Sequence, residues 1–301
     1  MLTKQKNIVP ITALLIGATF WGVAWYPFRL LEQAGIRGEA STTLTYFIAL
    51  LIGLVLFRKQ VRTFNFLDKA VYLLVWIGVC SGLANTAYVL GIIHGEVMRV
   101  LLLFYLAPLW TILFARVLLS EKLSLLGYWV ILLSLIGAMT MLWQPGNDFP
   151  LPASYGDWMG LSGGIMFALA NVLIRKNQAH NIQLKSMAIW LGVTLIGFFA
   201  TWKMESLPLI SDISTDIWVL LLVLGLMIFF LSIVLQYGLT HIPANQAIVI
   251  MLFELIVAAI ASYYLANETM TPKEWIGSLM IISASLFSAH INYVEPVSQQ
   301  P

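Results

Sequence analysis

The sequence predicts an all-α membrane protein in which ten transmembrane helices form two inverted repeats of five helices. Three observations carry this prediction: ten long apolar stretches, a composition that is 60% hydrophobic and 10% charged, and a second half that repeats the first. Soluble domains carry roughly 25% charged residues. Because backbone polar groups within lipid must bond internally, such long apolar runs favour helices.

Each apolar stretch approaches or exceeds the roughly 20 residues that a helix needs to cross a hydrocarbon core of about 30 Å. In chain order the stretches are Val9–Phe28, Ser41–Phe57, Ala70–Ile93, Val100–Ala115, Leu123–Asn147, Trp158–Ile174, Ser186–Trp202, Ile217–Thr240, Ile242–Leu265 and Trp275–Val294. Glu254 interrupts the ninth stretch and His290 the tenth. The first stretch is too long for a signal peptide and no small-residue cleavage site follows it, so we expect a retained helix.

Basic residues indicate how the helices are oriented. With the N-terminus in the cytoplasm, most lysines and arginines fall on the cytoplasmic side, whereas the loops after the fifth and seventh stretches are acidic. The basic residues on that side are Lys4, Lys6, Arg58, Lys59, Arg62, Lys69, Arg116, Lys122, Arg175, Lys176 and Lys185. The positive-inside rule therefore places both termini in the cytoplasm of a multi-pass protein in a bacterial-type inner (plasma) membrane.

An internal repeat divides the chain into residues 8–146 and 155–294. A shift of 147 positions aligns Glu268 with Glu121, His241 with His94 and Gly238 with Gly91, and a shift of 146 aligns Arg175 with Arg29 and Phe167 with Trp21. Since each half has five helices, an odd number, the halves must lie in opposite orientations. Inverted repeats are typical of carriers that alternately expose a site near the middle of the membrane.

Several motifs resemble the EamA-type families of the drug/metabolite transporter superfamily, over roughly residues 10 to 292. They are Trp21-Gly22 followed by Arg29, Phe104–Trp110 ending in Leu119–Leu123, and Leu252–Ile256 followed by Ala266–Thr271. The resemblance implies a ten-helix carrier or exporter of small metabolites, with a central cavity between helices one, three, four, six, eight and nine. It does not name the cargo. The family usually has a proline after the ninth-helix glutamate, and this chain has Leu255 at that position. The resemblance therefore leaves open whether helix nine bends as helix four does.

Glu254 is the clearest candidate for a functional residue, because ionisable groups within membrane spans usually face a cavity or a partner. One interpretation is a carboxylate that couples transport to protons or binds a cation. The other is a buried acid that holds helices together by hydrogen bonds. The sequence favours neither.

Two further polar groups lie near the mouths of the predicted bundle. Arg99 and Glu96 share one helix face and can pair, but the Arg99 guanidinium could also grip a substrate carboxylate in bidentate fashion. The repeat equivalent of Arg99 is Gln246, which follows Asn245. We expect Arg175 to extend to lipid head groups and Glu121 to organise a loop.

Aromatic residues lie too deep in several helices for the interfacial belt, so they either pack the core or line a cavity. Together with the polar candidates they complete the predicted substrate-binding set: Trp21, Trp25, Tyr88, Arg99, Phe104, Tyr105, Phe167, Asn171, Asn245, Gln246 and Glu254. Small residues at Ala13-x3-Gly17, Gly78-x3-Gly82 and Gly160-x3-Gly164 predict close helix contacts.

The sequence favours secondary-active transport by alternating access, with export of a small metabolite such as an amino acid. Exporters of hydrophobic cations or drugs are the main alternative, and a membrane-embedded enzyme or scaffold is a weaker one from another class. We find no catalytic constellation, no metal-ligand spacing and no phosphate loop, so we expect no cofactor, no metal and no nucleic acid. The expected partners are a small-molecule substrate, the lipid bilayer, protons as a coupling ion, and at most a second copy in a homodimer.

Overall fold

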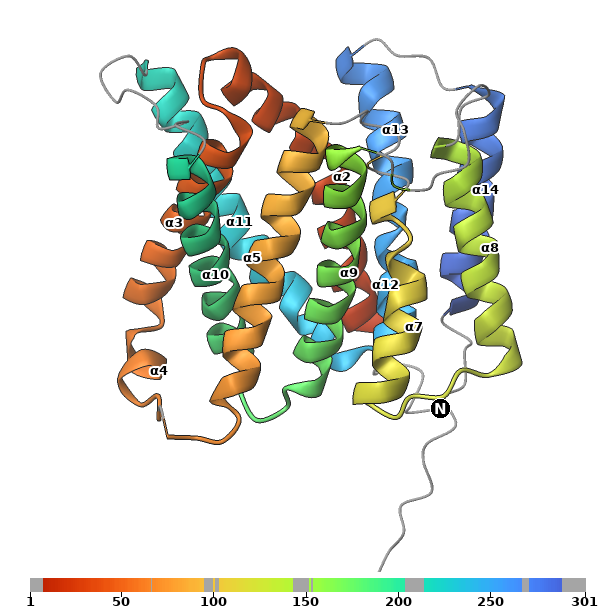
Figure 1. Cartoon of the computed structure of the whole chain (residues 1–301), viewed down its shortest axis with the longest axis horizontal. Coiled ribbons are helices and arrows are strands. Elements are labelled where there is room, and N and C mark those ends of the chain that lie inside the picture. Colours follow the sequence, from red (N-terminus) through yellow and green to blue (C-terminus); the bar gives the residue numbers. More distant parts are fainter. Residues whose placement is uncertain are drawn as a thin grey trace, which may run out of the picture.

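A computed structural model describes residues 8–65, 67–94, 100, 103–142, 152, 154–203, 214–266 and 271–288. Its regular elements are helices: α2 (Ile8–Gln33), α3 (Gly38–Leu56), α4 (Arg58–Arg62), α5 (Val71–His94), α7 (Ala107–Leu118), α8 (Leu125–Leu142), α9 (Tyr155–Lys176), α10 (Ile182–Lys203), α11 (Thr215–His241), α12 (Ala244–Met251), α13 (Phe253–Ala266) and α14 (Pro272–Ser288). The helices stand upright in the view of Figure 1, where α2, α11 and α12 lie behind α5, α9 and α7.

The helices account for the ten predicted spans and confirm the fold class. Seven spans in the described residues are long and apolar enough to cross a bilayer, with α12 and α13 counted as one. The shorter apolar helices α7, α8 and α14 complete the fourth, fifth and tenth spans.

The packing of the helices has two-fold symmetry between the halves of the chain. α5 packs along α9 as α11 packs along α2, and α10 packs on α5 as α3 packs on α11. Two further pairs, α3 with α10 and α8 with α14, map onto themselves when the halves are exchanged. α8 and α14 stand beside each other at one edge of the bundle (Figure 1). This is the contact pattern that inverted repeats produce.

Glycines set the distance between α5 and α10. A methyl group added at Gly78 would lie within 2.6 Å of the Ala188 carbonyl oxygen, and one at Gly82 within 2.6 Å of the Gly192 carbonyl oxygen. The predicted close contact at Gly78-x3-Gly82 is therefore confirmed. Because lipid tails are as apolar as leucine, such close packing is the main source of helix association in a membrane.

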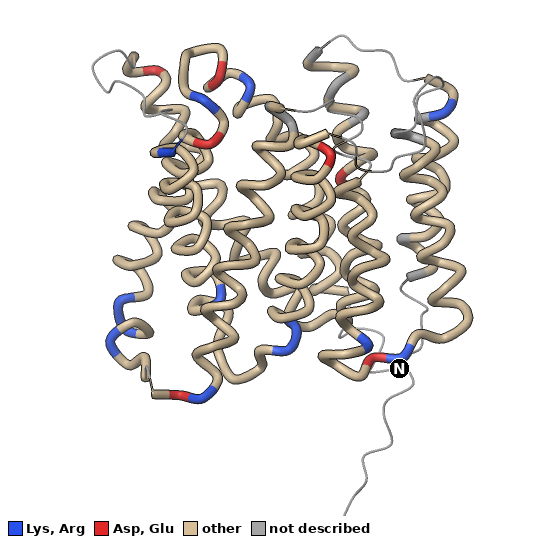
Figure 2. The backbone as a smooth tube through the Cα atoms, viewed as in Figure 1, with Lys and Arg blue, Asp and Glu red and all other residues tan. Residues whose placement is uncertain are grey.

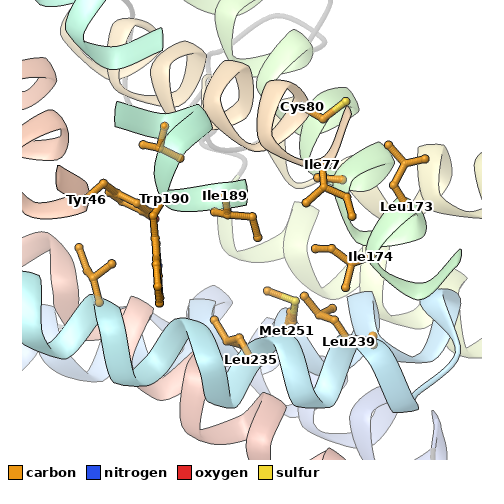
Figure 3. Packing of buried hydrophobic residues seen from close by; sticks show 14 of the residues in the cluster. Tyr46, Ile77, Cys80, Leu173, Ile174, Ile189, Trp190, Leu235, Leu239 and Met251 are labelled. Carbon is orange, nitrogen blue, oxygen red and sulfur yellow. The ribbon is translucent and has the colours of Figure 1, made fainter. Parts of the chain in front are cut away.

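The largest buried cluster joins helices of both halves around Trp190 of α10 (Figure 3). The Trp190 ring is fully buried and lies 5.1 Å from the Phe229 ring of α11. Tyr46 of α3 and Cys80 of α5 belong to the same cluster. Dense contacts of this kind hold the two repeats together by dispersion forces.

Most of the described lysines and arginines lie at one end of the bundle, and the others lie at the opposite end (Figure 2). The first of these, the basic end, holds α4, the C-terminal ends of α7, α9 and α11, and the N-terminal end of α10. Its described basic residues are Arg58, Lys59, Arg62, Lys69, Arg116, Lys122, Arg175, Lys176 and Lys185. Lys185 differs from the others because its side chain is completely buried.

Candidate functional site

Both the fourth and the ninth span are interrupted part-way along their length. In the fourth span, a turn at Tyr105 and Leu106 precedes α7, whose first turn contains Pro108. In the ninth span, a turn at Leu252 separates α12 from α13. A shift of 147 residues aligns Leu252 with Tyr105, so the two breaks are equivalent in the two repeats. Broken helices at the middle of a membrane are typical of transporter binding sites.

The ninth helix breaks without a proline. Leu252 N–H reaches the Ile248 and Val249 carbonyls at 3.3 Å each, and Leu255 N–H bonds to the Leu252 carbonyl at 3.1 Å. These short turns end α12 and start α13 afresh. The family's proline is thus not required for the break at this position.

Glu254 lies in the first turn of α13, directly after the break. Its Oε1 accepts a hydrogen bond of 3.1 Å from the Tyr105 hydroxyl, which belongs to the equivalent break in the first repeat. Tyr88 of α5 lies close enough to interact electrostatically with the Glu254 carboxylate. A helix N-terminus favours negative charge, so the break itself helps to hold a carboxylate here.

Aromatic rings pack around this pair. The Phe104 ring lies 5.2 Å from Tyr88, 5.6 Å from Tyr105 and 5.4 Å from Phe167 of α9. We call these four residues the aromatic cluster. The structure therefore brings together five residues of the predicted binding set, namely the aromatic cluster and Glu254.

Glycines of α9 seat the aromatic cluster. A methyl group at Gly164 would overlap the Phe104 carbonyl, and one at Gly160 would lie 2.6 Å from the Val100 carbonyl oxygen. The predicted contact at Gly160-x3-Gly164 is therefore confirmed, and its partner is the start of the fourth span. On the other side, a methyl group at Gly22 of α2 would lie 2.8 Å from the Glu254 carbonyl oxygen.

Glu254 has no basic partner among the residues that the structure describes. A carboxylate in such surroundings can bind a proton or an ammonium group, since burying an unpaired charge is costly. Aromatic faces also attract cations. The arrangement is thus suited to exchange a proton for an organic cation.

Three other candidates lie elsewhere along the same helices. Trp21 is half-buried against the largest hydrophobic cluster, which Phe167 also contacts. The Trp25 indole N–H and the Asn171 side-chain amide N–H are buried, and neither has a hydrogen-bond partner among the described residues. Buried donors without partners are rare in folded proteins, which distinguishes Trp25 and Asn171 from the other predicted residues.

Asn245 and Gln246 lie at the basic end of the bundle, apart from Glu254. Both are buried in the first turn of α12, and Asn245 is separated from Glu254 by roughly 13 Å along a helix axis. The Asn245 amide donates to Glu121 Oε2 at 3.5 Å. Arg99 falls outside the described residues.

The expectation that Arg175 extends to lipid head groups was wrong. Its guanidinium lies 4.0 Å from the Glu121 carboxylate and donates to the Thr240 carbonyl. Glu121 also does more than organise a loop, since it contacts Arg175 and Asn245 of the second repeat. Glu121 and Arg175 are both anchors of the internal repeat, and this signal could have drawn attention to them.

A sequence comparison identifies the family. The profile of the EamA-like transporter family matches the chain twice, at residues 9–143 and 154–289. The chain belongs to the EamA-like transporter family. The two matches cover most of the sequence and follow the internal repeat that was visible in the residues.

Individual relatives of this EamA-like transporter agree with the assignment. An uncharacterized transporter of Archaeoglobus fulgidus is 26% identical over 216 residues, which are 71% of this chain and 75% of the relative. The pseudopaline exporter of Pseudomonas aeruginosa is 24% identical over 220 residues, which are 71% and 70% of the two chains. A crystal structure of another protein shares the fold, with a TM-score of 0.76, 14% identity, and coverage of 94% of this chain and 98% of that chain.

Proposed function

We propose that this EamA-like transporter is a secondary-active exporter of a small metabolite with a protonated amine, such as an amino acid, and that it works by alternating access. The observation that carries the proposal is Glu254. This carboxylate lies at the break of a transmembrane helix, beside aromatic rings and without a basic partner among the described residues. Its hydrogen bond to Tyr105 joins the second repeat to the first.

A substrate ammonium group would pair with the Glu254 carboxylate and lie against the aromatic cluster. Cation–π contacts contribute roughly 0.5–2 kcal/mol each, with the larger values at desolvated sites. A proton and an ammonium group would compete for the same carboxylate, and both would disturb the bond from Tyr105. We therefore propose protons as the coupling ion, exchanged against the substrate at Glu254.

Similarity to a named exporter supports export, and the distribution of charge supports the orientation in the membrane. One relative is named as an exporter. The basic end of the bundle would lie in the cytoplasm according to the positive-inside rule, which places both termini of an inner-membrane protein there. Substrate would then enter from the end that holds Glu121.

Exporters of hydrophobic cations remain a second candidate, because the aromatic cluster suits such cations as well. The Trp25 indole N–H and the Asn171 amide N–H are buried donors without described partners, and either one favours a substrate with an acceptor group such as a carboxylate. A quaternary amine without a carboxylate would leave these donors unused.

Transport into proteoliposomes tests the proposal. The purified protein is reconstituted and offered a panel of radiolabelled amino acids and a quaternary amine, with and without a pH gradient. We expect accumulation of an amino acid that needs the gradient. Accumulation of the quaternary amine alone would favour the second candidate, and accumulation that ignores the gradient would contradict proton coupling.

A further inference from the structure

Polar contacts at the basic end of the bundle join the two repeats through Glu121. The Glu121 side chain is 14% exposed and that of Arg175 is 30% exposed. A pocket of about 170 Å³ lies beside them and is lined in part by Arg116, Lys122 and Asn245. Glu121 itself also lines this pocket at the basic end of the bundle.

The turn at the C-terminal end of α7 directs Glu121 into the bundle. Ser120 has a φ of 56°, which is left-handed, and both Leu119 and Glu121 donate their backbone N–H to the Ala115 carbonyl. Such a left-handed residue ends a helix and turns the chain sharply. A left-handed backbone is strained in a residue other than glycine, so the contacts around Ser120 must hold it.

Glu121 contacts three residues of the second repeat, namely Arg175, Ala244 and Asn245. Arg175 Nε of α9 lies 4.0 Å from its carboxylate, and the Asn245 amide donates at 3.5 Å. The backbone N–H groups of Ala244 and Asn245 also bond to the carboxylate. These N–H groups belong to the first turn of α12, whose residue before the helix, Pro243, makes no side-chain cap. Glu121 therefore supplies the cap for a helix of the other repeat.

The neighbouring polar contacts stay within the second repeat. Gln178 donates to the Arg175 carbonyl at 2.6 Å and to the Thr240 carbonyl at 3.2 Å. Lys185 donates to Thr240 Oγ1 at 2.8 Å and to the Ile174 carbonyl at 3.3 Å. These bonds hold the ends of α9 and α11 to α10. They need not change when the two repeats move relative to each other, whereas the bonds of Glu121 must.

An apolar layer lies next to Glu121, between the same helices. Ala115 of α7, Val172 of α9 and Ala244 of α12 form a separate buried cluster, with exposures of 0%, 0% and 2%. Ala115 comes from the first repeat and the other two from the second. The end of the bundle is thus closed by an apolar layer and by the polar contacts of Glu121.

We propose that Glu121 is the latch that closes the cytoplasmic side of the transporter, and that its contacts to Arg175 and to the start of α12 must break whenever the substrate site opens to that side. The latch rests on the alternating access proposed above. The latch can be tested without knowledge of the substrate, because opening of the cytoplasmic side would expose the apolar layer at Val172.

Cysteine labelling tests the latch. In a Cys80→Ala background, Val172→Cys reports exposure of the apolar layer to a maleimide, with the protein in lipid nanodiscs. Adding Glu121→Ala removes the latch, and we expect labelling at least about tenfold faster, because hydrogen bonds to charged groups contribute about 1.5–3 kcal/mol. An unchanged rate would overturn the proposal. The assay uses no substrate, so its failure is distinct from a failure of the transport assay.

Two controls separate a latch from a general loosening of the fold. Gln178→Ala removes bonds within the second repeat, and we expect it to leave the labelling rate of Val172→Cys unchanged. The native Cys80, which is 1% exposed in the large cluster, should label no faster in a Glu121→Ala chain that keeps it. Equal acceleration in either control would overturn the assignment of Glu121 as a specific latch.

Discussion

At the scale of single residues, two carboxylates connect the repeats at two depths. Glu254 bonds to Tyr105 at the helix breaks, and Glu121 bonds to the start of α12 at the basic end. Each acid lies in one repeat and has its partners in the other: Glu254 belongs to the second repeat and Glu121 to the first. A change of state in either acid therefore affects how the two repeats fit together.

The two interpretations of Glu254 predict opposite results for Glu254→Gln. If the carboxylate carries the coupling proton, the amide should fold normally and abolish pH-driven accumulation, while exchange of substrate across the membrane continues. If the acid is structural, the amide should transport as the wild type does. Proton-driven uptake and exchange in proteoliposomes distinguish these outcomes, and wild-type pH dependence would exclude the coupling role.

Glu254→Leu and Tyr105→Phe serve as matched controls. Leucine leaves the Tyr105 hydroxyl without its acceptor, so we expect a loss of about 1–3 kcal/mol in stability. Tyr105→Phe removes the same bond but keeps the acid that can titrate, so it should retain pH-driven transport. Melting temperatures and uptake of both variants test this.

Glu121 predicts a pH dependence of stability. Burial raises the pKa of its carboxyl above the ordinary value of about 4–5, against the opposing effects of Arg175 and of the backbone N–H groups of Ala244 and Asn245. The basic groups facing it are Arg175, and Arg116 and Lys122 across the pocket, where Tyr128 of α8 also lies. A carboxyl with a raised pKa binds its proton more tightly when folded, so stability falls as the pH rises from the unfolded pKa through the folded one.

The Glu121→Gln variant should not show this loss of stability with rising pH, because its amide does not titrate. The melting temperature of the wild type minus that of the variant should therefore decrease as the pH rises above the ordinary carboxyl range. Thermal unfolding in detergent across a series of buffers measures it. A difference that does not vary with pH would show that Glu121 has an ordinary pKa.

At the scale of elements, the two broken helices show that a break needs no proline. Pro108 starts α7, whereas Leu255 occupies the equivalent place in α13. What the two spans share is a turn that restarts the helix at the same depth. The difference lies in chemistry, since the break in the ninth span carries Glu254 and that in the fourth carries Tyr105.

Leu255→Pro should therefore be tolerated. Leu255 lies in the first turn of α13, where proline fits, and its N–H makes only the short bond to Leu252. We expect it to destabilise no more than Leu255→Ala, which removes the same buried side chain. Ala258→Pro, inside α13, should cost about 3 kcal/mol more. The melting temperatures of the three variants test this expectation. Equal losses of stability in Leu255→Pro and Ala258→Pro would contradict a preformed break at Leu252.

At the scale of the whole molecule, the charge distribution predicts the topology. Single cysteines in a Cys80→Ala background should label from the cytoplasm at Lys59 and Ala179, and only from the opposite side at Thr215. All three positions are exposed at helix ends or loops, whereas Lys185 is too buried to serve. Impermeant maleimides on spheroplasts and inverted vesicles make the measurement. Labelling of Ala179 and Thr215 from one side would contradict the inverted arrangement.

The sequence by itself determined the fold class, the ten spans and the relation between the halves. Long apolar runs leave the backbone no alternative to helices within lipid, and an odd number of helices in each half requires inversion. The sequence also singled out Glu254, since an acid in an apolar run is rare and usually faces a cavity or a partner. Close helix contacts at Gly78 and Gly160 were predictable because only small residues allow them.

Only the tertiary structure decided which residues meet. The bond from Tyr105 to Glu254 joins residues 149 positions apart, and hydropathy contains no information on such a distance. The same holds for Glu121 and Arg175, each of which reads as a helix-end residue on its own. Their partners depend on the angle and depth at which helices pack, and these follow from the shapes of many side chains at once. A pattern along the chain therefore predicts helices and rare residues, while the pairing of charges follows from the packed bundle.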